Sequence, residues 1–199
     1  MEGIFFYWFG WIGWIITTFF MKKSKVRTAV SFILLLLIIA GDHTYHLTGY
    51  SVHAPFILIF LFSLVFMTKT KGFMQLYYLI CSLIISIGYV CFCLFELFDP
   101  IWLFFDRKWM LSFVILYLIL MLVKDPTHRL AVVLIGICNG ELLYSMILTK
   151  FFGEIEIGNF VFLDALAFTI FFILIWNSLE KIAQFFEANI HKGKARRNY

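Results

Sequence analysis

The residues best suited to chemistry lie on the apolar stretch Leu130–Leu148, which is long enough to span a bilayer. Cys138, Glu141, Ser145 and Thr149 follow one another at spacings of three, four and four residues. A helix with about 3.6 residues per turn places all four on one face. The stretch is therefore predicted to carry a polar stripe that opens toward the outer side of the membrane, with Glu141 near the middle of the bilayer.

Glu141 is the strongest candidate for a functional group. A carboxylate that faces lipid costs several kcal/mol, so we expect Glu141 to face the bundle interior, either neutral or paired. No lysine or arginine falls within a predicted span at the same depth, which leaves a histidine, a hydroxyl, water or another carboxyl group as its partner. Intramembrane acids usually line a solvated pocket or a path for protons or cations. The alternative is that Glu141 only ties helices together through hydrogen bonds.

Further ionisable groups are expected at a similar depth when positions are converted at about 1.5 Å per helical residue. Counted from the inner membrane edge, Glu141 lies about 16 Å deep, and Asp42, His43, His53 and Asp164 lie about 21–22 Å deep, in a core about 30 Å thick. We therefore predict a polar site in the outer half of the membrane. Its candidate residues are Glu141, Asp164, Asp42, His43, His53 and Ser145.

The connection GDHTYHLTGYSVHAP gathers the histidines of this set. His43 and His46 are three residues apart and would share a helical face, and His53 follows in the same connection. Imidazole and carboxylate groups suit zinc and other transition metals, with Asp42 and Asp164 as the acidic candidates. The alternative is that the histidines are interfacial or hydrogen-bonded residues without a metal. No motif in the chain predicts a cofactor.

Membrane helices must hold these residues in place. The chain of 199 residues is 63% hydrophobic and 14% charged, which lies outside the range of soluble domains. A chain of this size cannot enclose so much apolar surface in water. All four cysteines fall inside apolar runs, so they are interpreted as packing residues and not as a disulfide framework.

The pattern predicts an all-α fold, a single bundle of seven transmembrane helices. A spanning helix needs about 20 mainly apolar residues, and a few of these stretches are shorter or include polar residues at their ends. The bundle occupies residues 1–179 and is followed by a basic tail, residues 180–199. The predicted spans are 3–21, 28–46, 52–67, 73–97, 109–123, 130–148 and 161–179.

Lysine and arginine predict the orientation of these spans. With the N-terminus outside, 13 of the 16 basic residues fall on the inner side and only Arg107, Lys108 and Lys150 on the outer side. Basic residues collect on the cytoplasmic side of membrane proteins. We therefore expect an extracellular N-terminus and a cytoplasmic C-terminus in a multi-pass protein of the cell membrane.

The tail is predicted to lie along the membrane surface. Ile182, Phe185, Phe186 and Ile190 fall on one helical face. Each basic side chain near an anionic surface adds about 1 kcal/mol, so anionic lipids are the expected partner. A docking site for a cytoplasmic protein is the alternative, and a nucleic-acid partner is not expected. The basic side chains that would contact lipid are Lys192, Lys194, Arg196 and Arg197.

The chain resembles the YphA-type family of small multi-pass membrane proteins of Bacillus-like bacteria. The size of the chain, the opening WFGWIGW and the connection GDHTYHLTGYSVHAP carry this resemblance. It covers the whole chain, and it implies a bacterial plasma membrane without implying an activity.

Three functions remain open from the sequence. The favoured one is a small transporter or a proton- or cation-conducting protein, with Glu141 as the titrating group. The second is a metal-dependent membrane enzyme acting on a lipid-linked substrate, and the third is a structural or regulatory membrane component. No nucleotide-binding glycine loop and no Ser/His/Asp arrangement is present, so an enzyme is the less favoured class.

Overall fold

The computed structural model describes residues 2–47, 50–68, 72–99, 101 and 103–197, and it describes only the backbone of residues 47 and 188–197. This part of the chain is mostly helical, with one small three-stranded sheet. Its elements are α1 (Ile4–Ile15), the π-helical turn η1 (Ile16–Phe20), α2 (Lys25–Ala40), β1 (Thr44–Leu47), β2 (Tyr50–His53), α3 (Ala54–Met67), α4 (Phe73–Phe98), α5 (Arg107–Leu122), α6 (Pro126–Phe152), β3 (Ile155–Ile157) and α7 (Phe160–Arg197).

Each of the seven predicted apolar segments coincides with a helix. Among the described residues, α4, α6 and the part of α7 up to Glu187 are long and apolar enough to cross a membrane, whereas α1 with η1 and α3 are shorter apolar helices. Large apolar side chains such as Phe73, Phe98 and Met121 are exposed on the outside of the bundle. A surface of this kind suits lipid and not water.

Local sequence signals begin several of the helices. The Ser24 hydroxyl accepts a hydrogen bond from the Arg27 amide and caps α2, and the Asp125 carboxylate accepts one from the Thr127 amide and caps α6. These side chains satisfy amide groups that the first turn of a helix leaves unpaired.

The small sheet corrects two predictions. The fold is not all-α, and the second predicted span does not continue to residue 46, because α2 ends at Ala40 and a strand begins at Thr44. β1 pairs antiparallel with β2, and β2 pairs parallel with β3. The strands are rich in residues that favour extended backbone, such as Thr44, Tyr45 and Val52, and their ladder satisfies backbone groups at the end of the bundle. His43 and His46 therefore do not share a helical face.

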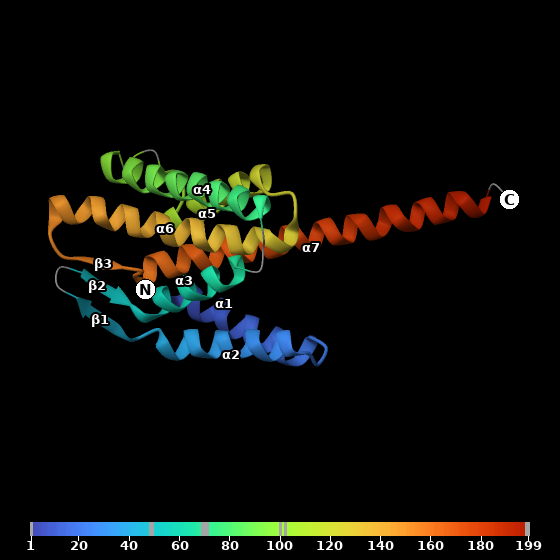
Figure 1. Cartoon of the computed structure of the whole chain (residues 1–199), viewed down its shortest axis with the longest axis horizontal. Helices are drawn as coiled ribbons and strands as arrows, with labels where there is room; N and C mark the ends of the chain where they lie inside the picture. The colour runs from blue at the N-terminus through green and yellow to red at the C-terminus, as the bar shows by residue number, and fades with distance from the viewer. Residues whose placement is uncertain (1, 48–49, 69–71, 100, 102, 198–199) are drawn as a thin grey trace.

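The helices run up and down between two ends of the bundle (Figure 1). The end that carries the N-terminus and the sheet is called the sheet end, and the opposite end, from which α7 projects, is called the tail end. The connections α1–α2 and α5–α6 lie at the tail end, as do the end of α3 and the start of α4. Helix α7 continues without a break through residue 179, so the predicted tail begins as part of the same helix.

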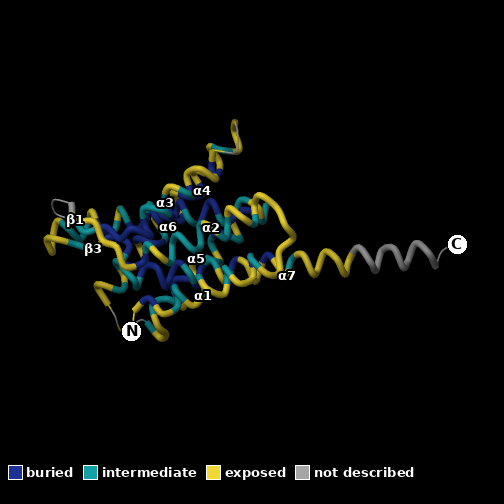
Figure 2. Tube along the Cα trace, turned by 90° about the horizontal axis from the view of Figure 1, so that it is seen from below, coloured by how far each residue is buried: buried dark blue, intermediate teal, exposed yellow. Residues whose placement is uncertain are grey.

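Helix α6 occupies the centre of the bundle, and buried residues concentrate along it (Figure 2). It packs most extensively against α4 and also against α3, while α5 and α1 pack against α7. A Cβ atom on Gly136 would lie 2.8 Å from the Cβ of Ile85, and one on Gly140 would lie 2.8 Å from the ring of Tyr89. The two helices therefore approach so closely that only glycine fits at these two positions.

We predict that Gly136→Ala lowers the stability of the protein by about 1–3 kcal/mol, because the added methyl group overpacks the contact with Ile85. Thermal unfolding in detergent, followed by circular dichroism, measures this change. Gly13→Ala is the matched control, because a Cβ atom there would meet Leu34 at an ordinary 3.5 Å. Equal melting temperatures for the two variants would contradict the close approach of α4 and α6.

Candidate functional site

Glu141 lies in the interior of the bundle with 4% of its surface exposed. The Tyr89 hydroxyl donates a hydrogen bond to Oε2 of Glu141 at 2.5 Å, and the amide of Gly158 donates to Oε1 at 3.3 Å. The carboxyl group thus has a hydroxyl partner, which is one of the partners expected from the sequence. Hydrogen bonds of this kind offset the cost of taking a carboxyl group out of water.

Two glycines make this arrangement around Glu141 possible. Gly140 leaves room for the ring of Tyr89, which brings the phenol alongside α6. Gly158 has a φ of +72°, a left-handed conformation that favours glycine, and a Cβ atom there would lie 2.4 Å from the Cβ of Phe56. The turn at Gly158 directs its amide group at Glu141 from the segment that precedes α7.

Arg107 supplies a positive charge near Glu141 that the sequence analysis missed. It is the first residue of α5, and its guanidinium turns inward, with Nε 3.1 Å from Oε2 of Glu96 and Nη2 donating to Sγ of Cys93 at 3.2 Å. It interacts electrostatically with Glu141. The sequence analysis considered only basic residues within the predicted spans, and Arg107 lies outside them. Arg107 precedes the fifth predicted span and had been assigned to an outer loop, but its long side chain reaches back into the bundle.

Polar side chains line one face of α4 along most of its length. The spacings between them are four, four, three, four and three residues, which keeps them on the side that faces α6. At about 1.5 Å per residue the face extends for about 27 Å, close to the thickness of a hydrocarbon core. All but the last of them are buried. This polar face of α4 consists of Tyr78, Ser82, Ser86, Tyr89, Cys93 and Glu96.

Charged groups stand at both ends of the polar face of α4. At the tail end, the ring of Tyr78 stacks on His128 with centroids 4.8 Å apart, and Nδ1 of His128 lies 2.6 Å from Oδ2 of Asp125. The Thr127 amide and then the His128 ring lower the pKa of Asp125, so Asp125 is ionised at neutral pH. At the sheet end, Arg107 contacts both Cys93 and Glu96.

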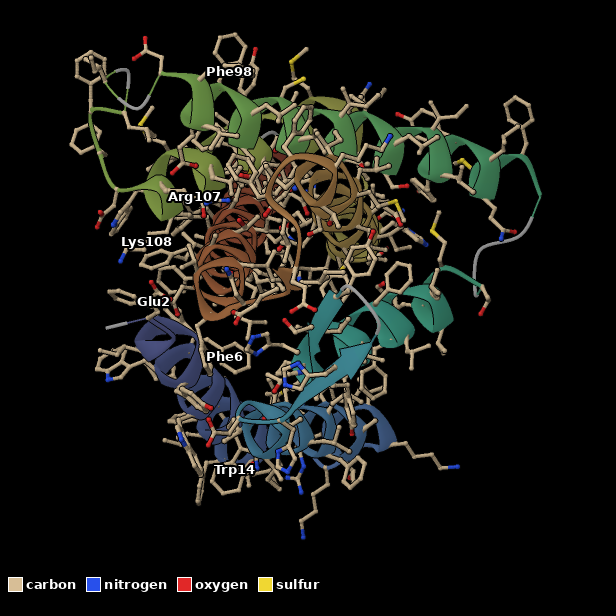
Figure 3. All side chains as sticks on the ribbon, turned by 90° about the vertical axis from the view of Figure 1, so that its left-hand side faces the viewer. Glu2, Phe6, Trp14, Phe98, Arg107 and Lys108 are labelled. Carbon is tan, nitrogen blue, oxygen red and sulfur yellow. The ribbon has the colours of Figure 1, made fainter. Side chains whose placement is uncertain are left out.

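Arg107 also lines a polar hollow of about 140 Å³ at the sheet end. Figure 3 looks onto this end and shows Arg107 and Lys108 on α5 close to Glu2, just before α1. The residues that line the hollow are Glu2, Asp106, Arg107, Lys108, Val161 and Asp164.

Asp164 holds the start of α1. Its Oδ2 accepts a hydrogen bond from the amide of Gly3 at 3.0 Å, and its Oδ1 accepts one from the amide of Phe6 at 2.8 Å. Asp164 therefore caps a helix that is distant in sequence, in the way a local N-cap residue would. It does not share a contact with Glu141, although the two residues were predicted to belong to one site.

The remaining predicted residues are spread over the sheet end. Asp42, His43 and His46 are exposed, and His53 is buried against the ring of Phe160. Within the described part of the chain, no three His, Cys, Asp or Glu side chains are placed to hold a metal ion. The structure thus does not bring His43, His46 and His53 together as a ligand set. Nε2 of His53 instead lies 3.6 Å from Oε2 of Glu156.

Ser145 is buried on α6, one helical turn beyond Glu141, and Cys138 is buried one turn before it. The polar stripe of α6 therefore faces the bundle, whereas Thr149 at its end is partly exposed. The predicted lipid-surface residues Lys192, Lys194, Arg196 and Arg197 have side chains that fall outside the described part of the chain.

A family model described as "YphA-like integral membrane protein" matches residues 2–199. The chain belongs to this family. The resemblance predicted from the sequence is thereby confirmed, and the protein is an integral membrane protein. "Uncharacterized protein YphA" of Bacillus subtilis (strain 168) is 30% identical to it over 168 residues, which cover 83% of this chain and 82% of the relative. No solved structure matches the chain.

Two features of the site have recognisable signals in the sequence. Gly136 and Gly140 form a G-x-x-x-G pattern inside an apolar helix, which is typical of close helix packing. The residues of the polar face of α4 are three or four positions apart, so this face can also be recognised from the sequence. Arg107 had no such signal, because the direction of its side chain depends on the position of Cys93 and Glu96 on another helix.

Arg129 is a second buried cation that the sequence analysis placed in a loop. It donates from Nε to the Val123 carbonyl and from Nη2 to the Lys124 carbonyl, and its Nη1 donates to Oδ1 of Asn177 and Oε2 of Glu180, each at 2.8 Å. Only 4% of Arg129 is exposed. It therefore joins the α5–α6 connection to α7 at the tail end.

We predict that Asp164→Ala lowers stability by about 1–2 kcal/mol, because two amide groups at the start of α1 lose their acceptor. Thermal unfolding in detergent measures the loss. Asp106→Ala is the control, since Asp106 is exposed and its side chain makes no capping hydrogen bond to α5. An unchanged melting temperature for Asp164→Ala would mean that α1 does not depend on this cap.

We predict that Arg129→Met costs about 3 kcal/mol, because it leaves Glu180 without its charged partner and removes donors from two carbonyl groups. Thermal unfolding in detergent measures this loss of stability, and the substitution of the exposed Lys124 by methionine, Lys124→Met, is the control. A loss no greater than that of the control would show that Arg129 does not hold α7 to the bundle.

Proposed function

We propose that this integral membrane protein conducts protons, with Glu141 as the group that takes up and releases them. The observation that carries the proposal is the polar face of α4, which extends from the Asp125–His128 pair at the tail end to Arg107 at the sheet end. Glu141 contacts this face near its middle through Tyr89. A buried acid between two charged ends is typical of proton relays in membrane proteins.

Protons suit the site better than larger solutes do. Hydroxyl, thiol and carboxyl groups can each give up one proton and accept another, so a proton passes along them without an open channel. In one concerted step the Tyr89 hydroxyl passes its proton to the Glu141 carboxylate while its oxygen takes the thiol proton of Cys93. Cys93 takes its replacement from the protonated carboxyl group of Glu96, which is reprotonated from solvent at the sheet end, while Arg107 keeps its charge throughout. Ser86, one turn from Tyr89, has no hydrogen-bond partner for its Oγ in the described part of the chain, which leaves this hydroxyl free to reorient.

The proposal includes an orientation. The inner loops that the basic residues predict are the connections at the tail end, and the predicted outer loops belong to the sheet end (Figure 1). We therefore place the tail end in the cytoplasm and the sheet end outside, with the seven helices crossing the membrane. The basic end of α7, which projects from the tail end in Figure 1, would then lie on the cytoplasmic side.

The other two functions have less support. A metal-dependent enzyme needs a ligand set, and the described residues do not form one. A purely structural role is favoured by the hydrogen bonds of Asp164 and Arg129, each of which ties distant helices together. Glu141 differs from these two because its partner Tyr89 belongs to the polar face of α4, which connects both ends of the bundle.

We predict that Glu141→Gln abolishes proton flux, because an amide can still accept the Tyr89 hydrogen bond but does not titrate. The protein is reconstituted into vesicles containing a pH-sensitive dye, and a potassium gradient with valinomycin drives protons inward. Tyr89→Phe should reduce the flux at least about tenfold, equivalent to about 1.4 kcal/mol in the barrier. The exposed Glu154→Gln is the matched control and should conduct like the unsubstituted protein.

Flux that is equal in the unsubstituted protein and in Glu141→Gln would refute the proposal, as would the absence of flux above empty vesicles. In that case thermal unfolding of the same variants tests the structural role. A loss of stability without any flux would support a scaffold built on buried hydrogen bonds.

A further inference from the structure

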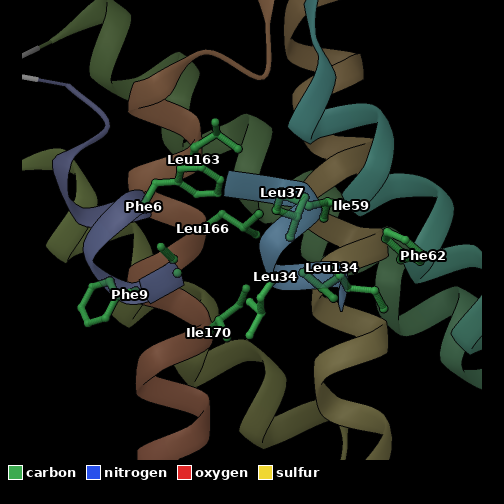
Figure 4. Close-up of a pocket in the computed structure, with 13 residues that line it drawn as sticks. Phe6, Phe9, Leu34, Leu37, Ile59, Phe62, Leu134, Leu163, Leu166 and Ile170 are labelled. Carbon is green, nitrogen blue, oxygen red and sulfur yellow. The ribbon is translucent and has the colours of Figure 1, made fainter. Parts of the chain in front are cut away.

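An apolar cavity of about 190 Å³ lies between α1, α2, α3, α6 and α7 (Figure 4). It is separate from the polar face of α4, and its walls are almost wholly hydrocarbon. Phe6 and Leu163 close the cavity toward the sheet end, while Leu134 and Ile170 lie at the opposite end of the view in Figure 4. Leu34 and Leu37 form the wall on the side of α2.

Helix α2 covers the cavity incompletely. Within α2 no residue is fully buried, whereas α3, α4 and α6 each bury several. The cavity is larger than the engineered cavity of about 150 Å³ that holds benzene. A hollow of this size beside a bilayer is a suitable space for a hydrocarbon chain, because its walls cannot hold water by hydrogen bonds.

Positive charge collects at the end of α2 nearest the tail end of the bundle. Lys22 and Lys23 precede α2, and Lys25 and Arg27 lie in its first turn. In the described part of the chain none of the four forms an ion pair with an acidic side chain, and the first turn of α2 contains no acidic residue. These four residues are called the α2 basic cluster.

The α2 basic cluster and the cavity share one face of α2. Arg27 precedes Leu34 by seven residues, which is close to two helical turns, so both residues point in nearly the same direction. The distance between them along the helix is about 10 Å. An acyl chain that starts at a headgroup on Arg27 therefore reaches the wall of the cavity at Leu34 with length to spare.

We propose that the protein binds an anionic phospholipid, with its phosphate on the α2 basic cluster and one acyl chain in the cavity between α2 and the bundle. The charge of the cluster selects an anionic headgroup, and the apolar walls hold the chain. This site goes beyond the proposed conduction of protons, because neither Glu141 nor the polar face of α4 takes part. It is also distinct from the basic end of α7.

Lipid that remains on the purified protein tests the proposal. The full chain is purified in a mild detergent from bacterial membranes, and bound lipid is extracted and quantified by mass spectrometry. We expect about one phosphatidylglycerol per protein. Leu34→Trp fills the cavity and should lower the retained lipid at least fivefold, whereas Phe32→Trp places the same ring on the exposed side of α2 and should leave it unchanged.

A headgroup variant tests the second half of the site. Replacing the α2 basic cluster by glutamine should remove the preference for phosphatidylglycerol over phosphatidylethanolamine when the detergent-purified protein is titrated with either lipid and its melting temperature is followed. The control replaces the exposed Lys124 and Lys181 by glutamine in the full chain and should keep the preference. Loss of the preference in this control would mean that the headgroup does not depend on the α2 basic cluster and would overturn the proposal.

Leu37→Phe is a smaller substitution in the same wall of the cavity, and it replaces Leu34→Trp in the retention experiment if Leu34→Trp does not fold. Retention of the lipid by both folded cavity variants would overturn the proposal, as would equal losses in Leu34→Trp and Phe32→Trp. Recovery of a fatty acid or a neutral isoprenoid in place of a phospholipid from the unsubstituted protein would also overturn it.

Discussion

Where α4 crosses α6, Gly136 and Gly140 have no side chains, and the side chains of Ile85 and Tyr89 on α4 pack directly against the backbone of α6. In a bilayer this contact cannot be driven by the removal of apolar surface from water, because lipid tails are as apolar as the helices. It depends on close packing, which requires glycine at these positions. The same contact places the Tyr89 hydroxyl within hydrogen-bond distance of Glu141. The packing of α4 against α6 therefore also determines the partner of the buried acid.

Buried polar side chains also join the helices to one another at both ends of the bundle. Asp164 on α7 caps α1 at the sheet end, and Arg129 joins the start of α6 to α7 at the tail end. Each of these side chains satisfies backbone amides or carbonyls that the ends of helices leave unpaired. Between these two ends α2 has no fully buried residue, and its Leu34 and Leu37 line the apolar cavity.

The polar face of α4 and the cavity behind α2 give the bundle two unlike halves. One side of α6 meets hydroxyl, thiol and carboxyl groups, and Leu134 on α6 faces hydrocarbon. The proposed proton relay and the proposed lipid site therefore use different neighbours of one central helix. Helix α6 packs more extensively against α4 than against any other helix. The two glycines of α6 allow this contact, and its carboxyl group, Glu141, bonds to Tyr89 of α4.

The sequence by itself determined the class of protein, the family and, apart from the end of α2, the approximate positions of the seven helices, because the chain has more apolar surface than a water-soluble fold of its size can bury. It also singled out Glu141 as a buried group, since an acid in such a run is too costly to face lipid. The tertiary structure alone decided the partners of the charged residues. Depth along a helix is proportional to residue number, but the direction of a side chain and its neighbours depend on how the helices pack. For that reason Asp164 turned out to cap α1, and Arg107 turned inward from a position that the sequence assigned to a loop.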